Sequence, residues 1–173
     1  MRQNISIPSS GGANYYWNLL LHLLEKYTDR ETAIIVSKYF AIDIDRASQS
    51  AFAMFQGQKT HTNEAIKQAQ DLIEKNVTEK ISIDELADKV LVGRRSFERR
   101  FKQATNNTVL EYIHRVKIEA AKRSFETSRK NITDVMFDVG YTDTKAFRSI
   151  FKKITGLTPV EYRNKYNKMA VAA

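Results

Sequence analysis

The sequence predicts an all-α protein, and three observations support this prediction. Apolar residues recur at spacings of three and four in several segments, which is the pattern of one helix face. Capping-box sequences, which begin helices, occur at Ser82, Thr108 and Thr158. The 173 residues include only 6 Gly and 2 Pro, which fits a helical protein better than a β-sandwich or barrel. We therefore expect helices joined by short turns.

Composition excludes several kinds of site. The chain has no cysteine, so disulfide frameworks, zinc-thiolate sites and cysteine nucleophiles are ruled out. Its histidines, His22, His61 and His114, lie far apart without metal-ligand spacing, so we expect no metal and no cofactor. No apolar stretch approaches the roughly 18 residues of a membrane helix, and no signal peptide is recognisable. We therefore expect no membrane partner and a cytoplasmic location.

Two apolar helices are expected near the N-terminus. The first runs from Ala13 to about Tyr27, and the second runs from about Arg30 to Phe40, with Thr28 or Asp29 as its cap. Their apolar residues need a partner surface, and a second copy of the same helices would provide one. The polar stretch 56–63 contains Gly57 and suits a linker. We place a domain boundary there, near His61.

Positive charge is concentrated in the second half of the chain. Residues 94–153 contain 15 Lys or Arg and 7 Asp or Glu, whereas residues 1–63 contain 6 and 5. Such a local excess favours an anionic partner for the second half.

An internal repeat occupies this basic half. When each residue of 80–112 is compared with the one 50 positions later, ten of 33 positions are identical without a gap. Phe97, Phe101 and Tyr112, for example, correspond to Phe147, Phe151 and Tyr162. This density of matches indicates two copies of one supersecondary unit.

Each copy has the pattern of helix, short turn and helix, at about 82–105 and 132–155. The first helices carry apolar residues at helical spacing, and Gly93 and Gly140 suit the turns. In the second copy Thr142 or Asp143 caps the next helix. The apolar positions are Ile83, Leu86, Ala87 and Val90 in one copy and Ile132, Val135, Met136 and Val139 in the other.

The second helix of each copy has one apolar and one cationic face. At 100° per residue, Phe97 and Phe101 share a face, as do Phe147 and Phe151. The opposite faces carry Arg95, Glu98, Arg99 and Lys102 in the first copy, and Lys145, Arg148, Ser149 and Lys152 in the second. A basic second helix after a tight turn is typical of helix-turn-helix motifs, which place it in the DNA major groove.

A long helix, 109–127, connects the two copies. Its length is roughly 28 Å at about 1.5 Å per residue. It carries apolar residues on more than one face, which fits a helix packed against both units. A spacer of this length could set two recognition helices about one DNA turn, roughly 34 Å, apart.

Residues 64–168 resemble the DNA-binding domain of the AraC family of bacterial transcription regulators. The matching motifs are 83–87, 99–102, 117–121, 132–141 and, most specifically, the run from Phe147 to Arg163 with its spacing of Phe, Phe, Gly and Pro. The resemblance implies seven helices with two helix-turn-helix units that bind adjacent major grooves of promoter DNA. It also implies a non-enzymatic regulator, usually an activator, with RNA polymerase as a further candidate partner.

The resemblance also assigns the DNA-contacting positions. The family's groove-facing positions, which helical phase selects almost identically, fall on Arg95, Glu98, Arg99, Thr144, Lys145, Arg148 and Ser149, and we expect base contacts there. We expect phosphate contacts from Arg94, Lys102, Lys152 and Lys153.

Residues 1–60 resemble the end of the PfpI-like, class I glutamine amidotransferase-like domain found in one branch of the family. The resemblance depends on the Ser-Gly-Gly turn at 10–12, the Leu-rich helix and the run 43–49. The nucleophile-elbow region of that domain is absent, so we expect a helical remnant without catalysis, followed by the regulator domain and a tail at 169–173. Two alternatives stay open: an enzyme remnant acting as an interaction module, and a non-specific nucleic-acid-binding protein.

Overall fold

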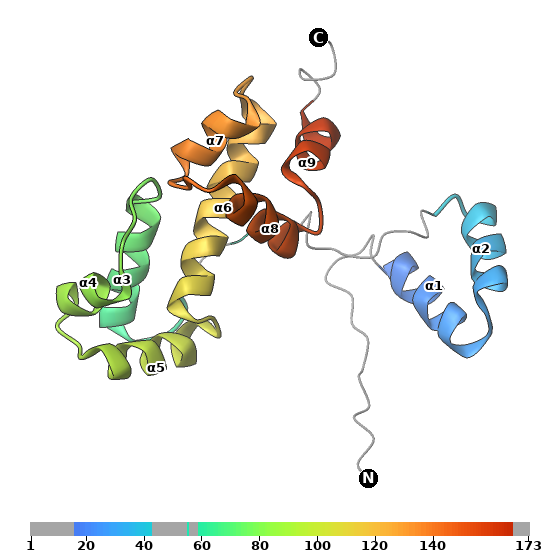
Figure 1. Cartoon of the computed structure of the whole chain (residues 1–173). Coiled ribbons are helices and arrows are strands. Elements are labelled where there is room, and N and C mark those ends of the chain that lie inside the picture. Colours follow the sequence, from blue (N-terminus) through green and yellow to red (C-terminus); the bar gives the residue numbers. More distant parts are fainter. Residues whose placement is uncertain (1–15, 43–54, 56–58, 168–173) are drawn as a thin grey trace. The chain divides into compact units, whose positions relative to one another are not determined.

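A computed structural model describes residues 16–42, 55 and 59–167 (Figure 1). The described residues form helices and no strands, as expected for an all-α protein. The chain divides into two compact units, 1–49 and 50–173. None of the helices in the described part of the chain is long and apolar enough to cross a membrane.

The N-terminal unit contains two packed helices, α1 (Tyr16–Tyr27) and α2 (Arg30–Tyr39). Asp29 is the N-cap of α2, because its Oδ1 accepts a hydrogen bond of 2.7 Å from the Thr32 amide. The described residues of these helices that are buried are few and mostly small: Leu21, Ala33 and Ser37. The glycine turn at 10–12 and the run 43–49, which carry the amidotransferase resemblance, lie outside the described residues.

The second unit contains seven helices in its described part, as the resemblance predicted. They are α3 (Glu64–Lys75), α4 (Ile83–Lys89), α5 (Arg94–Thr105), α6 (Val109–Thr127), α7 (Ile132–Asp138), α8 (Thr144–Thr155) and α9 (Pro159–Tyr166). All three predicted capping boxes form, at the starts of α4, α6 and α9. At each of them the cap hydroxyl accepts from the third helical amide, while the glutamate accepts from the cap amide.

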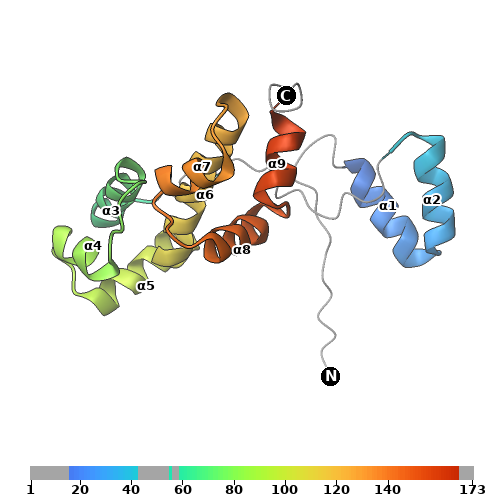
Figure 2. The same ribbon diagram turned by 45° about the horizontal axis from the view of Figure 1, so that its top comes forward.

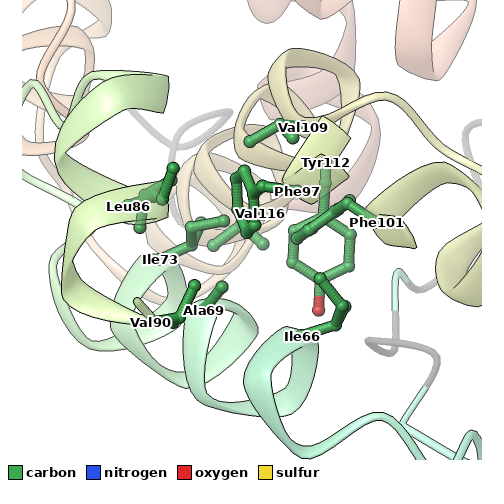
Figure 3. Packing of buried hydrophobic residues seen from close by; sticks show 11 residues of the cluster. Ile66, Ala69, Ile73, Leu86, Val90, Phe97, Phe101, Val109, Tyr112 and Val116 are labelled. Atoms are coloured by element: carbon green, nitrogen blue, oxygen red, sulfur yellow. The ribbon is translucent and has the colours of Figure 1, made fainter. Parts of the chain in front are cut away.

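The first hydrophobic core lies between α3, α4, α5 and the N-terminal half of α6 (Figure 3). Phe97 and Phe101 are fully buried, and the Phe101 ring packs edge-on against Tyr112 at 5.3 Å. The Tyr112 hydroxyl donates to Glu74 Oε1 at 2.7 Å and accepts from the buried Gln70 amide at 3.0 Å. The aromatic residues of α5 are therefore part of the core and leave the opposite face of the helix outside.

The second core repeats this arrangement around α7, α8 and α9. Phe147 and Phe151 are fully buried, and Phe151 packs edge-on against Tyr162 at 5.5 Å. The Tyr162 hydroxyl donates to Glu126 Oε1 at 2.5 Å. Thr105 and Thr155 each donate to the carbonyl four residues earlier, at 2.8 Å.

Helix α6 belongs to both cores. Val109, Tyr112 and Val116 pack into the first, whereas Ile118, Ala121 and Phe125 pack into the second. Figure 1 shows α6 running between the α3–α5 group and the α7–α9 group. The prediction that this helix packs against both units is confirmed.

The repeat differs from the ungapped alignment in its first helices. Four residues separate α4 from α5, and five separate α7 from α8. The ends of α4 and α7 correspond at an offset of 49 residues. Leu91 and Gly140 both adopt the left-handed conformation just after the C-cap, with φ of 54° and 73°. From α5 and α8 onward the offset is 50. The ungapped alignment is therefore wrong before the turn, since the second turn contains one more residue.

Residues preceding α3 also contact the second unit, although sequence analysis assigned Phe55 to the N-terminal part and 56–63 to a linker. The Phe55 amide donates to Glu119 Oε2 at 3.1 Å, and its ring packs on Tyr112 at 5.1 Å. Lys59 pairs with Asp71 and Glu74 at 2.6 and 2.7 Å. A polar composition does not distinguish a free linker from a segment that is attached by such contacts.

Candidate DNA interface

The two predicted recognition helices, α5 and α8, lie along the same lower edge of the second unit in the view of Figure 2. Buried phenylalanines fix the rotation of each helix about its axis: Phe97 and Phe101 in α5, and Phe147 and Phe151 in α8. Because residues three and four apart share a helix face, the polar residues between these phenylalanines must point away from the cores.

The structure places all eleven predicted contact residues at the surface. Glu98 is half-buried, and the other ten are exposed: Arg94, Arg95, Arg99, Lys102, Thr144, Lys145, Arg148, Ser149, Lys152 and Lys153. The predicted base-contacting and phosphate-contacting residues of each helix therefore share its outward side. Their DNA contacts stay predictions.

Acidic neighbours partly neutralise the N-terminal end of α5. Arg94 Nη1 binds both carboxylate oxygens of Asp84, at 2.8 and 3.0 Å, and Arg94 Nε lies 3.5 Å from Glu98 Oε1. These neighbours raise the pKa of the Arg94 guanidinium, Asp84 most of all. A phosphate at Arg94 would have to compete with Asp84, which sequence analysis did not anticipate because the two residues are ten positions apart.

Further along α5 the cations are more available. Arg99 Nη1 donates a 3.4 Å hydrogen bond to Gln103 Oε1, which leaves most of its donors open. The side chains of Arg95 and Lys102 make no hydrogen bond or ion pair with any residue that the structure describes. These side chains can therefore bind an external anion or a base edge without first breaking an ion pair.

Helix α8 has a better-capped start and freer cations than α5. Asp143 Oδ1 accepts a 2.8 Å hydrogen bond from the Ala146 amide, whereas Gly93 provides no side-chain cap for α5. Among the described residues, no carboxylate forms an ion pair with Lys145, Arg148, Lys152 or Lys153. An anionic partner can therefore bind the cationic face of α8 without first breaking an ion pair.

A surface groove beside α5 adds residues that sequence analysis missed. Arg95, Glu98, Arg99 and Lys102 line it together with Ile83, Gln103, Thr108, Val109 and Leu110. Leu110 is 52% exposed at the start of α6, and Val160, its counterpart at the start of α9, is 43% exposed. Two exposed apolar residues at repeat-equivalent positions were a signal in the sequence. They can contact thymine methyl groups or sugars next to a bound helix.

Carboxylates near the recognition helices are occupied by their own helix starts. The Thr108 amide donates to Glu111 Oε2 at 2.8 Å, and this hydrogen bond is the main cause that lowers the pKa of Glu111. The Thr158 amide does the same for Glu161. Within the described residues, no group of three His, Asp or Glu side chains is placed to hold a metal ion.

Comparison with known proteins finds similarity in the second unit of the chain. The family model of a helix-turn-helix domain matches residues 86–165. The bifunctional transcriptional activator/DNA repair enzyme AdaA of Bacillus subtilis is 37% identical over 93 residues, which are 54% of this chain and 44% of AdaA. The HTH-type transcriptional regulator ArgR of Pseudomonas aeruginosa is 28% identical over 148 residues, which are 85% of this chain and 45% of ArgR. The chain thus spans less than half the length of these relatives.

A solved structure agrees with the described arrangement of helices. A transcriptional regulator from Chromobacterium violaceum, described among AraC-type DNA-binding domain-containing proteins, is 27% identical with a TM-score of 0.57. The similarity covers 60% of this chain and 93% of that one.

Proposed function

We propose that the chain uses its helix-turn-helix domain, which is similar to an AraC-type DNA-binding domain, to bind a specific promoter sequence and regulate transcription. The observation that carries the proposal is the pair of basic helices, α5 and α8. Their buried phenylalanines pack into cores that share the two halves of α6, so their polar faces turn outward. Such helices fit two successive major grooves. Because promoter DNA is the proposed partner, we also propose that the protein acts in the bacterial cytoplasm.

In this proposal the two helices divide the contacts as their exposed groups allow. Arg95, Glu98 and Arg99 of α5 contact bases, and so do Thr144, Lys145, Arg148 and Ser149 of α8. Arg94, Lys102, Lys152 and Lys153 contact phosphates and set the register of the protein on the duplex. Of these four, Arg94 makes the weakest phosphate contact, because Asp84 already neutralises it.

Binding alone, without catalysis, is the proposed activity of the chain. AdaA is described as a repair enzyme as well as an activator, but this chain spans only 44% of it. We propose that the protein activates transcription and that RNA polymerase is a further partner. For residues 1–60 we propose a remnant of an amidotransferase-like domain. This proposal rests on the sequence resemblance at 10–12 and 43–49. The 148-residue similarity to ArgR is longer than residues 64–173, so the likeness to a transcriptional regulator includes residues that precede 64.

A second copy of the chain is the proposed partner of the N-terminal helices. Trp17, Leu20, Ile35 and Phe40 are 39–61% exposed on α1 and at or near α2. Several exposed apolar side chains together favour burial against a partner, and the apolar side chains of another α1–α2 pair provide such a surface. Sedimentation of the full chain should show a dimer that Ile35→Glu converts to a monomer, and a monomeric parent protein would contradict this part of the proposal.

The test of DNA recognition compares base and phosphate contacts on one helix. A binding site is first selected from random duplexes with the full chain. Arg99→Ala should then cost about 1–3 kcal/mol on the selected site and much less on random duplex, because a bidentate base contact is lost. Lys102→Ala should weaken both duplexes alike and reduce the slope of log K against log salt by about 1.

The same pair of substitutions on the other helix is the matched control. Arg148→Ala and Lys152→Ala should repeat the contrast at different base pairs of the selected site. Equal losses for Arg99→Ala on selected and random DNA would make Arg99 a phosphate contact. A parent protein that selects no sequence at all would instead support the non-specific nucleic-acid-binding alternative.

A further inference from the structure

A buried lysine lies where the two helix-turn-helix units meet. Lys117 stands in the middle of α6, between Val116 of the first core and Ile118 of the second, and only 8% of it is exposed. Its ammonium donates to Val77 O at 2.6 Å and Glu79 O at 3.1 Å, both between α3 and α4. It also donates to Val139 O at 2.9 Å, in the turn between α7 and α8.

The Lys117 ammonium links the backbones of the two helix-turn-helix units. An ammonium has three donors, and here all three are used by carbonyl oxygens, two from the first unit and one from the second. No ion pair among the described residues includes Lys117. Burial lowers its pKa, so the charge is kept at a cost that the three carbonyl contacts must offset. An apolar residue would fill the space but could not hold the two backbones together.

Gly140 brings the same two backbones into direct contact. Its φ is +73°, and a Cβ added there would lie 2.3 Å from Thr78 O and 2.6 Å from Lys117 Nζ. The next residue, Tyr141, continues the contact: its ring lies 5.9 Å from Lys117 Nζ, and its hydroxyl is 2.7 Å from His114 Nδ1. We call Lys117, Gly140 and residues 77–79 the inter-unit clasp.

We infer that the inter-unit clasp fixes the distance and rotation between α5 and α8, and that Lys117 is thereby a positioning residue for half-site spacing. The inference rests on the proposed function. Because α4–α5 and α7–α8 are each joined by a short turn, locking the segment before α4 to the turn before α8 leaves little freedom between the recognition helices. Moving one half-site by one base pair displaces it by about 3.4 Å and rotates it by about 35°, which a locked pair cannot follow.

The test measures affinity against spacing with the full chain. Duplexes carry the selected site with −1, 0, +1 or +2 base pairs inserted between its half-sites, and further duplexes carry either half-site alone. The parent protein should prefer one spacing and lose about tenfold to hundredfold at the next, the usual loss for mismatched contacts. Lys117→Met should reduce this preference to about threefold or less, while its affinity for each isolated half-site stays within about twofold of the parent's.

Lys122→Met is the matched control. Lys122 is a second buried lysine of α6, but it pairs with Glu119 at 2.8 Å on its own helix. Its loss should lower stability and leave the spacing preference as it is. Retained half-site affinity shows that a variant is folded. If Lys117→Met fails that check, Lys117→Gln, which keeps two amide donors, should show the same reduction in part.

Four outcomes are decisive. A flattened spacing profile with intact half-site affinity in the lysine variant supports the inference. A parent-like spacing profile in the folded variant overturns it, and so does an equal flattening in Lys122→Met. A parent protein that binds no selected sequence overturns the proposed function instead, and the two failures are therefore distinguishable.

Discussion

The first and second helix-turn-helix units share a buried aromatic scaffold but place their turns in opposite surroundings. Phe101 packs on Tyr112 as Phe151 packs on Tyr162. The left-handed residue of the first turn, Leu91, is 94% exposed. Its counterpart Gly140 lies against the backbone of the other unit, where no Cβ fits.

The two turns are therefore under different structural constraints. In the first unit any residue that tolerates a positive φ would serve, and the sequence has a leucine there in spite of the strain. In the second unit the turn is part of an interface, and the approach of Thr78 O demands glycine. The two copies therefore share the buried aromatic residues of their cores, whereas the residue in each turn depends on the surroundings of that turn.

The largest expected effects test whether the two cores are equivalent. Phe101→Ala and Phe151→Ala should each lower the free energy of unfolding by about 3–5 kcal/mol, the usual loss for a buried phenylalanine. Urea unfolding followed by circular dichroism would measure it. Because α6 belongs to both cores, each variant should still unfold in one transition. Early melting of only the mutated half would show that the units are independent.

The next effect tests the difference between the turns directly. Gly140→Ala should cost about 2 kcal/mol or more, because a left-handed alanine is strained and its Cβ would collide with Thr78 O. Leu91→Ala, the matched change in the exposed turn, should alter stability by less than about 0.5 kcal/mol. Thermal melting of both variants makes the comparison. Equal shifts would contradict the packed turn of the second unit.

A smaller effect separates the two buried tyrosines. Tyr112 bonds to both Glu74 and Gln70, whereas Tyr162 bonds to Glu126. Tyr112→Phe should therefore cost about 2 kcal/mol and Tyr162→Phe about 1 kcal/mol, since the former removes two hydrogen bonds. Chemical denaturation at neutral pH would rank them. A larger loss for Tyr162→Phe would mean that its single contact with Glu126 outweighs the two contacts of Tyr112.

The smallest expected effect is a gain. Leu91→Gly should stabilise the protein by about 1 kcal/mol, because glycine adopts a positive φ without strain and the lost side chain is exposed. A rise in the melting temperature, with DNA affinity unchanged, would be the expected observation. No rise would mean that the higher entropy of glycine in the unfolded chain offsets the relief of strain.

Helical phase and caps predicted the regular parts of the fold closely. The range expected for α6 and the end expected for the first unit at 105 match those observed, since a capping box defines the start of α6 and the phenylalanine spacing defines the faces of α5. The same phase placed the candidate DNA-contacting side chains outward. These features depend on residues within a few positions of one another, which a sequence displays directly.

The parts that sequence missed depend on contacts between distant residues. Lys117 is one of several charged residues in α6, and nothing local shows that its acceptors are carbonyls some 40 residues before it and 22 after it. The Arg94–Asp84 pair depends on the turn between their helices. The extra residue of the second turn was hidden because most identities in the repeat fall after it.

The sharing of α6 makes the duplicated domain indivisible. A fragment ending at Thr127 would keep the first core but expose Ile118, Ala121 and Phe125. A fragment starting at Val109 would keep the second core but expose Val109, Tyr112 and Val116, and a cut between the two sets would break α6 in its middle. Neither half is a module that a genome could transfer or copy separately. Any change in the number of DNA-reading units must therefore duplicate the whole seven-helix domain, which limits how this architecture can grow.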